Sequence, residues 1–253
     1  MWHGDYFFLL RNLILKDFRT RYRNMSLGVF WSLVNPIVMM IVMTFVFTKI
    51  FHNPTPKFPV HVLCGLIPFT FFSQTWVSGT TSVVDNASLI KRVPVPREAL
   101  PIANVLGSSI HLFIQVGLLL LVALAFRTGI NWYWLWLPAL LVAELVFVCG
   151  CALVCGALNV YIRDMRYVVE SACTVLFWLV PIFYDISFVP AKYAEIYQYN
   201  PIAALVLALR NVLLDARAPR APLLLKLFFV SFAMLAFGGF AFRRLRRGFY
   251  DYL

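Results

Sequence analysis

The stretch Leu100–Phe126 reads LPIANVLGSSIHLFIQVGLLLLVALAF and contains no Asp, Glu, Lys or Arg. A run of about 20 apolar residues is long enough to cross the hydrocarbon core of a bilayer as a helix. Lipid offers no hydrogen bonds to the backbone, so a segment in this position must satisfy its own N–H and C=O groups. The stretch therefore predicts a membrane-spanning helix.

Five further stretches share this character, at residues 27–50, 60–84, 135–158, 168–189 and 223–242. The composition agrees, since 62% of the residues are apolar, 13% are charged and the mean hydropathy is +0.81. A soluble domain carries about a quarter charged residues, so this chain cannot cover a water-facing surface. The sequence predicts an all-α integral membrane protein in which residues 1–253 form a single domain with six transmembrane helices.

Small residues inside the spans indicate close packing between helices. The five cysteines lie in apolar stretches, where they are expected to pack rather than to form disulfides, and we predict no metal site. Glycine, serine and alanine let helix backbones approach in a membrane. The residues expected to do so are Gly107, Ser108, Gly150, Ala152, Gly156, Gly238 and Gly239.

The Lys and Arg residues are distributed unevenly between the two sides of the predicted membrane. Such residues collect on the cytoplasmic side, which explains the net charge of +11 without a nucleic-acid partner. The short loops of one side hold only Lys49, Lys57 and Arg127. Both termini, including the tail 243–253, are therefore predicted to be cytoplasmic in a multi-pass protein of the cytoplasmic (inner) membrane. The basic residues of that side are Arg11, Lys16, Arg19, Arg21, Arg23, Lys91, Arg92, Arg97, Arg163, Arg166, Arg243, Arg244, Arg246 and Arg247.

Two segments have helical character without the length or pattern of a span. Residues 1–26 place polar side chains on one sector of a helix and apolar ones away from it, which predicts an amphipathic helix in contact with membrane lipids at the cytoplasmic interface. Residues 190–222 contain the apolar run Pro201–Leu214, which is too short to span. We expect this connection to dip part-way into the membrane from outside as a re-entrant hairpin.

The sequence lacks the motifs of an enzyme. No G-x-x-x-x-G-K-[ST] phosphate-binding loop occurs, and Glu170 and His111 have no motif partners for catalysis. Glu144 is the one acidic residue deep within a span, and an ionisable group there is a candidate for ion coupling. A membrane-embedded glycolipid-modifying enzyme and an ion-coupled carrier dependent on Glu144 stay open as alternatives.

Several spaced motifs give the chain a family resemblance. Asp17–Pro36 reads DFRTRYRNMSLGVFWSLVNP and Thr44–Phe51 reads TFVFTKIF. Further along are SLIKRVPVPRE, YIRD, PIFY and NP, which begin at Ser88, Tyr161, Pro181 and Asn200. In this order, and on six spans, the motifs closely resemble the membrane subunit of ABC-2-type (type V) polysaccharide exporters, which move O-antigen, capsule or teichoic acid polymers.

The resemblance implies a homodimer of this chain with two copies of an ATPase subunit, which would bind ATP and Mg²⁺. The chain itself would hold no cofactor and perform no bond chemistry. Its substrate would be a polyprenyl-pyrophosphate-linked polysaccharide, such as the O-antigen of lipopolysaccharide. An ABC-2 exporter of a small lipid or a drug is the alternative within the same class.

The segment 85–99 would be the coupling helix that docks on the ATPase. Its candidate residues are Ser88, Leu89, Ile90, Lys91, Arg92, Pro94, Pro96, Arg97 and Glu98. An ordinary positive-inside loop would explain Lys91 and Arg92 but not the Pro-Val-Pro-Arg-Glu ending. Arg163 and Asp164 mark the second cytoplasmic loop.

The substrate headgroup would bind at the base of the first span. Arg19, Arg21 and Arg23 precede it, and an arginine fork takes phosphate oxygens in pairs. The alternative is that these arginines hold ordinary lipid headgroups.

Aromatic side chains would line the glycan channel, or would belong to the membrane-interface belt. The candidates are Phe30, Trp31, Phe69, Phe72, Trp76, Phe177, Trp178, Phe183 and Tyr184. By resemblance the outer hairpin would be a gate over this channel, with Asn200, Pro201 and Arg210 as its candidate residues.

Overall fold

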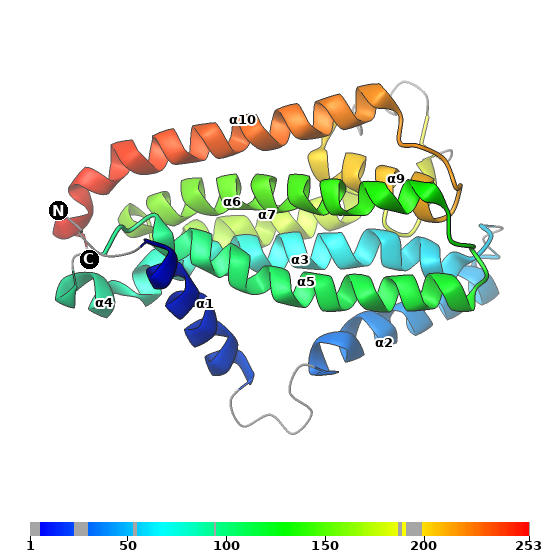
Figure 1. The fold of residues 1–253 in the computed structure, drawn as a ribbon, viewed down its shortest axis with the longest axis horizontal. Coiled ribbons are helices and arrows are strands. Elements are labelled where there is room, and N and C mark those ends of the chain that lie inside the picture. Colours follow the sequence, from blue (N-terminus) through cyan, green and yellow to red (C-terminus); the bar gives the residue numbers. More distant parts are fainter. Residues whose placement is uncertain are drawn as a thin grey trace.

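The computed structural model describes residues 6–22, 30–52, 55–93, 95–186, 189–190 and 199–252, and helices account for nearly all of them. Four long helices run side by side along the molecule: α3 (Phe58–Asp85), α5 (Ala99–Ala125), α6 (Leu137–Tyr161) and α10 (Ala221–Leu245) (Figure 1). The other elements are α1 (Tyr6–Tyr22), α2 (Trp31–Phe45), η2 (Val46–Ile50), α4 (Ala87–Arg92), η3 (Trp132–Trp136), α7 (Met165–Leu179), α9 (Pro201–Leu213) and η5 (Arg246–Asp251).

The all-helical membrane fold is confirmed, with no strand among the described residues. Within the described ranges, five helical segments are long and apolar enough to cross a bilayer, and they coincide with five of the six predicted spans. The segments are Trp31–Ile50, Phe58–Arg92, Ala99–Ala125, Trp132–Tyr161 and Ala221–Phe249.

The remaining predicted span, residues 168–189, is not one continuous helix. α7 ends at Leu179, and Val180 takes an extended conformation with φ −76° and ψ 134°. A residue before proline is pushed out of the helical region, and Pro181 has no N–H to continue the ladder. The prediction of helix beyond Leu179 is therefore wrong. The 15 residues of α7 reach about 22 Å, less than the hydrocarbon thickness of about 30 Å.

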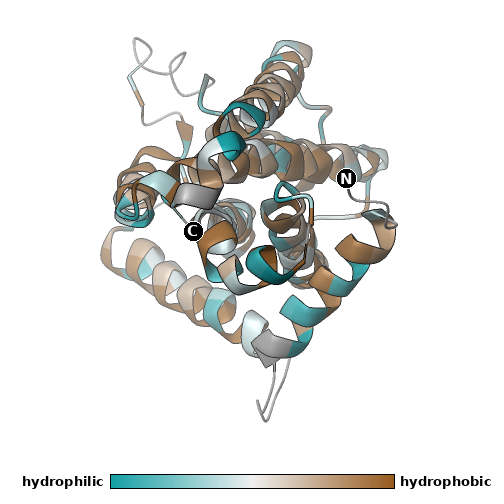
Figure 2. Ribbon diagram, turned by 90° about the vertical axis from the view of Figure 1, so that its left-hand side faces the viewer, coloured by the Kyte–Doolittle hydropathy of each residue, from teal (hydrophilic) through white to brown (hydrophobic). Residues whose placement is uncertain are grey.

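The predicted basic segments gather at one end of the bundle. α1, α4 and η5 lie there, and α9 lies at the other end (Figure 1). We call the first the basic end. Viewed from that end, most of the helical ribbon has the colour of hydrophobic residues (Figure 2). The exposed apolar side chains of α2, α7 and α10 suit contact with lipid or with another protein.

Small residues hold α6 against its neighbours. A Cβ on Gly150 would lie 2.6 Å from the Met234 carbonyl carbon, and one on Gly238 would lie 2.5 Å from the Gly150 oxygen. On the other face of α6, a Cβ on Gly79 would lie 2.6 Å from the Ala152 Cβ. Close packing is thus confirmed at Gly150, Ala152 and Gly238, whereas a Cβ on Gly239 would meet nothing within 4 Å.

Candidate transport groove and coupling surface

A stripe of uncharged polar side chains follows one face of α3. Its members recur every three or four residues, which places them on the same side of a helix. We call it the polar stripe, and it consists of Thr70, Ser73, Gln74, Ser78 and Thr81. In a bilayer such groups are costly to expose to lipid, so the stripe needs water, protein or a ligand beside it.

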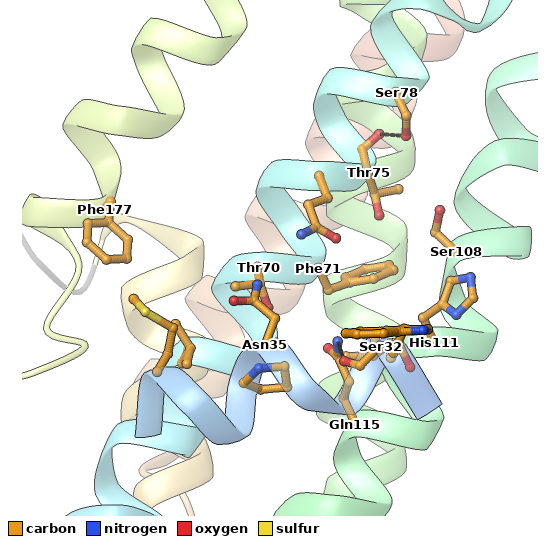
Figure 3. Close-up of a pocket in the computed structure, with 16 residues that line it drawn as sticks. Ser32, Asn35, Thr70, Phe71, Thr75, Ser78, Ser108, His111, Gln115 and Phe177 are labelled. Carbon is orange, nitrogen blue, oxygen red and sulfur yellow. Dashed lines mark hydrogen bonds between the residues drawn. The ribbon is translucent and has the colours of Figure 1, made fainter. Parts of the chain in front are cut away.

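The first hollow beside this stripe is a central cavity of about 510 Å³ between α2, α3 and α5 (Figure 3). Asn35, Gln74, His111 and Gln115 supply polar groups to its wall, and Trp31 supplies an aromatic face. The Gln115 side chain donates a hydrogen bond of 3.0 Å to the Ser32 carbonyl, which ties α5 to the start of α2. The wall therefore offers hydrogen bonds and ring faces together.

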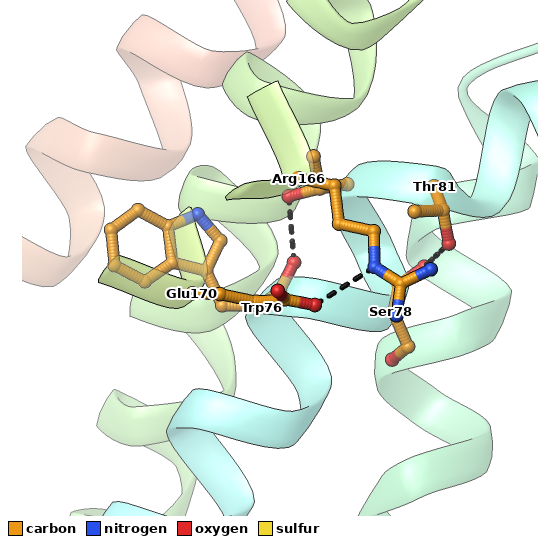
Figure 4. Close-up of polar contacts among 6 residues, drawn as sticks. Trp76, Ser78, Thr81, Arg166 and Glu170 are labelled. Atoms are coloured by element: carbon orange, nitrogen blue, oxygen red, sulfur yellow. Dashed lines mark hydrogen bonds and ion pairs between the residues drawn. The ribbon is translucent and has the colours of Figure 1, made fainter. Parts of the chain in front are cut away.

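The second hollow, of about 570 Å³, lies between the polar stripe and α7. Arg166 and Glu170 form its α7 side, and the Arg166 Nε donates to the Glu170 Oε1 at 2.8 Å (Figure 4). Among the described residues that line this hollow, only these two are charged, and the others include Val77, Cys173 and Thr174.

The third hollow, of about 230 Å³, opens at the basic end between α1, α3 and α5. Lys16, Asp17 and Asp85 line it, and the Lys16 ammonium donates to the Asn86 Oδ1 at 2.9 Å. Ser78 lines all three hollows. The hollows therefore lie next to one another along α3, and we call them together the α3 groove.

The aromatic candidates divide between this groove and other environments. Trp31 and Phe177 line the central cavity. Phe30 and Trp178 are each 69% exposed on the outer surface. Phe69, Phe72 and Phe183 are buried and pack against aromatic neighbours in the core. The Trp76 indole N–H donates to the Cys155 Sγ. The Tyr184 hydroxyl donates to the Trp178 and Leu179 carbonyls.

Of the three headgroup candidates, the structure describes the side chain of Arg19 only. Arg19 is exposed on α1, while the side chain of Arg21 and the whole of Arg23 lie outside the described residues. The structure places α1 against α5, with the Phe18 ring stacked on His111 at 6.2 Å between centroids. Any headgroup role for these arginines stays a prediction.

The coupling candidates form the short helix α4 and a following non-helical segment that is hydrogen-bonded to Arg246. In α4, Ser88, Lys91 and Arg92 are exposed and Ile90 is buried. Beyond it, the Glu98 carboxylate accepts a hydrogen bond of 2.8 Å from the Arg246 guanidinium, and Arg97 donates to the Arg246 carbonyl at 2.7 Å. Leu89 and Pro96 are half-buried, and Pro94 lies outside the described residues. The segment is thus fixed to η5 and leaves two basic side chains free to meet a partner.

The second basic-end loop joins α6 to α7. Arg163 and Asp164 are exposed there, and Asp164 directly precedes the first residue of α7. The Tyr161 hydroxyl donates to the Leu245 carbonyl at 2.6 Å, which fixes the end of α6 to α10.

At the opposite end, Asn200 and Pro201 begin α9. The Asn200 side chain accepts from the Ile202 N–H at 3.0 Å, and proline at the first helical position fixes the starting conformation. Arg210, near the end of α9, is only 5% exposed. Its guanidinium donates to the Ile182 carbonyl at 2.9 Å and to the His61 and Tyr184 carbonyls at 3.4 Å. Arg210 therefore donates to the Ile182 and Tyr184 carbonyls, which follow the break after α7, and ties them to the His61 carbonyl of α3.

Glu144 lies apart from all of these groups. It is 1% exposed in α6, and within the described part of the chain neither carboxyl oxygen has a hydrogen-bond partner. It lines none of the three hollows. Its position gives no support to a carrier that would move ions through the α3 groove.

Comparison with known proteins identifies the family. A model of the ABC-2 type transporter family matches residues 9–214, which run from within α1 to the end of α9 and include every residue that lines the groove. The chain belongs to the ABC-2 type transporter family. It is therefore a membrane subunit of a transporter, and the predicted resemblance is confirmed.

Several relatives share most of the length of this ABC-2 chain. The O-antigen export system permease protein RfbA of Klebsiella pneumoniae is 26% identical over 84% of this chain and 82% of its own. RfbA of Myxococcus xanthus is 27% identical over 90% of this chain and 88% of its own. The polysialic acid transport protein KpsM of Escherichia coli is 25% identical over 77% of this chain and 76% of its own.

Two features of this ABC-2 chain, the polar stripe and the Arg166–Glu170 pair, were not predicted from the sequence. The polar stripe was detectable, because Thr70, Gln74, Ser78 and Thr81 have helical spacing inside an apolar run. The Arg166–Glu170 pair also has the i, i+4 spacing of a helical ion pair. Its position opposite the stripe is a matter of tertiary packing, which no local pattern reveals.

Proposed function

We propose that this chain is the transmembrane subunit of an ATP-driven exporter that carries a polyprenyl-pyrophosphate-linked, O-antigen-like polysaccharide across the cytoplasmic membrane. The α3 groove carries the proposal, because it joins hydroxyl and amide side chains with the aromatic faces of Trp31 and Phe177. Sugar hydroxyls hydrogen-bond to the first kind of group, and sugar rings lie against the second. The names of the relatives, which export O-antigen or transport polysialic acid, point to the same substrate class.

In this proposal two copies of the chain pair with two copies of an ATPase subunit. The sequence has no phosphate-binding loop of its own, so ATP and Mg²⁺ are bound by the partner. Lys91 and Arg92, exposed on α4, meet the partner, and the Glu98–Arg246 bond transmits its movement to α10. The basic end then faces the cytoplasm, as the positive-inside rule requires.

The route follows from the order of the hollows. The lipid headgroup is held at the basic end by Arg19, Arg21 and Arg23, at the level of α1. The glycan follows the polar stripe from the third hollow to the central cavity. The outer hairpin, with Asn200, Pro201 and Arg210 in α9, closes the far end until the polymer passes.

A bulky side chain at Ser78 tests the proposal, because this residue lines all three hollows. Ser78→Trp is expected to reduce surface polysaccharide at least about tenfold and to trap polymer in the cytoplasm on its lipid carrier. Leu121→Trp, at a position 67% exposed on α5, is the matched control with normal export. Normal surface polymer in the Ser78→Trp strain would contradict the proposed route. Trapped polymer also excludes an exporter of drugs or small lipids.

Glu144→Gln separates this function from an ion-coupled carrier. Because Glu144 lines none of the hollows, export should continue at a near-normal rate after the substitution. Loss of export with a normally folded and inserted protein would favour the carrier. The readout is the amount of surface polymer at equal protein level.

A further inference from the structure

Arg166 and Glu170 form an ion pair in the second hollow of the α3 groove to which the proposed route gives no task. The Arg166 Nε donates to the Glu170 Oε1 at 2.8 Å; the two side chains are 55% and 39% exposed, and both line the hollow. Among the described residues, the two terminal NH₂ groups of this guanidinium have no hydrogen-bond partner. Four N–H bonds are thus available to a ligand.

The surroundings of this guanidinium suit an anion on a carbohydrate carrier. Ser78 and Thr81 of the polar stripe lie beside it (Figure 4), and Ser73 and Gln74 line the same hollow; all four are uncharged. Ser78 belongs to the central cavity and to the basic-end hollow as well. A ligand that moves along α3 from the basic end therefore passes within the reach of Arg166.

We propose that Arg166 binds the phosphate-bearing headgroup of the transported lipid, and that Glu170 is an internal competitor which holds the guanidinium when the groove is empty. This inference rests on the proposed function and assigns a headgroup site in addition to the arginines near α1. The chemical class is a pyrophosphate or phosphate ester. Its paired oxygens match the guanidinium fork, and Arg166 lies in the first turn of α7, where the helix dipole favours negative charge.

The internal competitor makes the site reversible. An exposed i, i+4 ion pair contributes little to stability, so a doubly charged phosphate group can replace Glu170 at small cost. The Glu170 carboxylate stays within reach of the guanidinium and opposes a long-lived complex with an anion. A transporter needs such a site, since its headgroup must leave again.

A purely structural ion pair makes a different prediction from an anion site. If the pair served only to stabilise α7, loss of either partner would have the same small effect. If Arg166 binds phosphate, Arg166→Gln weakens binding and Glu170→Gln strengthens it. The two substitutions remove the same bond, so opposite signs identify the ligand site.

The experiment measures binding of polyprenyl pyrophosphate to the full chain in nanodiscs of zwitterionic lipid. Arg166→Gln is expected to weaken binding about tenfold, which is the loss of one or two charge-assisted hydrogen bonds, and Arg166→Lys is expected to weaken it less. Glu170→Gln is expected to bind a few-fold more tightly. Arg244→Gln, an exposed basic-end residue of α10 outside the groove, is the matched control and should bind like the unmodified chain.

The outcomes separate this inference from the function on which it rests. Equal affinities for the unmodified chain, Arg166→Gln and Glu170→Gln would overturn the anion site and leave the exporter proposal standing. No binding by the unmodified chain would overturn both. Inorganic pyrophosphate serves as a competitor: displacement of the lipid supports recognition of the phosphate group itself, and displacement lost in Arg166→Gln places that recognition at this residue.

Discussion

Arg210 is the residue on which the α9 end of the molecule depends. α7 stops at Leu179, and the following residues 180–183 are buried inside the protein. The Ile182 and Tyr184 carbonyls both receive hydrogen bonds from the Arg210 guanidinium, as does the His61 carbonyl of α3. One side chain thus supplies hydrogen bonds to backbone carbonyls after the end of α7, where water is scarce.

We expect Arg210→Met to destabilise the protein by about 2–3 kcal/mol, because it leaves buried carbonyls without a partner. Arg210→Lys keeps a donor but not the fork, and should cost less. Thermal unfolding in detergent, followed by tryptophan fluorescence, measures the difference. Arg217→Met changes an exposed arginine at the same end of the molecule and is the control. An Arg210→Met protein as stable as this control would refute the structural role.

At the scale of the elements, two adjacent glycines of α10 differ sharply. A Cβ on Gly238 would lie 2.5 Å from the Gly150 oxygen of α6, whereas one on Gly239 would meet nothing within 4 Å. Gly238→Ala is therefore expected to cost about 1–3 kcal/mol through overpacking. Gly239→Ala should be neutral or slightly stabilising, because alanine is the better helix former. Equal unfolding temperatures for the two variants would contradict the packing of α6 on α10.

The coupling segment yields a second prediction at this scale. Lys91→Glu with Arg92→Glu should lower ATPase stimulation and export severalfold without changing the unfolding temperature, because both side chains are exposed. Arg97 differs, since it bonds to the Arg246 carbonyl and lies over the Phe249 ring. Arg97→Glu should therefore also loosen the segment. Co-purification with the ATPase subunit measures docking, and an unaltered yield after the double change would exclude α4 as the contact.

Particular elements show where sequence reasoning succeeds and where it stops. Apolar length alone locates five of the spans, since the bilayer imposes it. The prediction for residues 168–189 fails at Pro181, which ends the helix inside a run that hydropathy treats as continuous. The aromatic side chains of Phe69 and Phe72 were predicted to line a channel, yet they pack in the core. Gln74 and Ser78, on the same helix, line the groove instead. Which face of α3 points inward depends on α6 and α7, and these contacts are not local in the sequence.

At the scale of the whole molecule, one copy of the chain leaves the α3 groove incomplete. The second hollow is open on one side, and α2 and α7 beside the groove expose large apolar side chains such as Ile41, Phe45 and Trp178. A polar stripe that faces hydrocarbon is costly, and a second copy against this face would cover it. The proposed homodimer therefore uses the face of α2 and α7, and α10 faces lipid on the other side of α6.

Single cysteines on the two sides test this arrangement. We expect Val168→Cys, Val175→Cys or Trp178→Cys, all exposed on α7, to give an oxidised species of twice the chain mass in membranes. Phe229→Cys, 74% exposed on α10, should not. The unmodified chain is the background, because among its own cysteines Cys64, Cys151, Cys155 and Cys173 are buried and Cys149 is half-buried. Cross-linking through α10 alone would move the dimer to the opposite face and leave the α3 groove without its second wall.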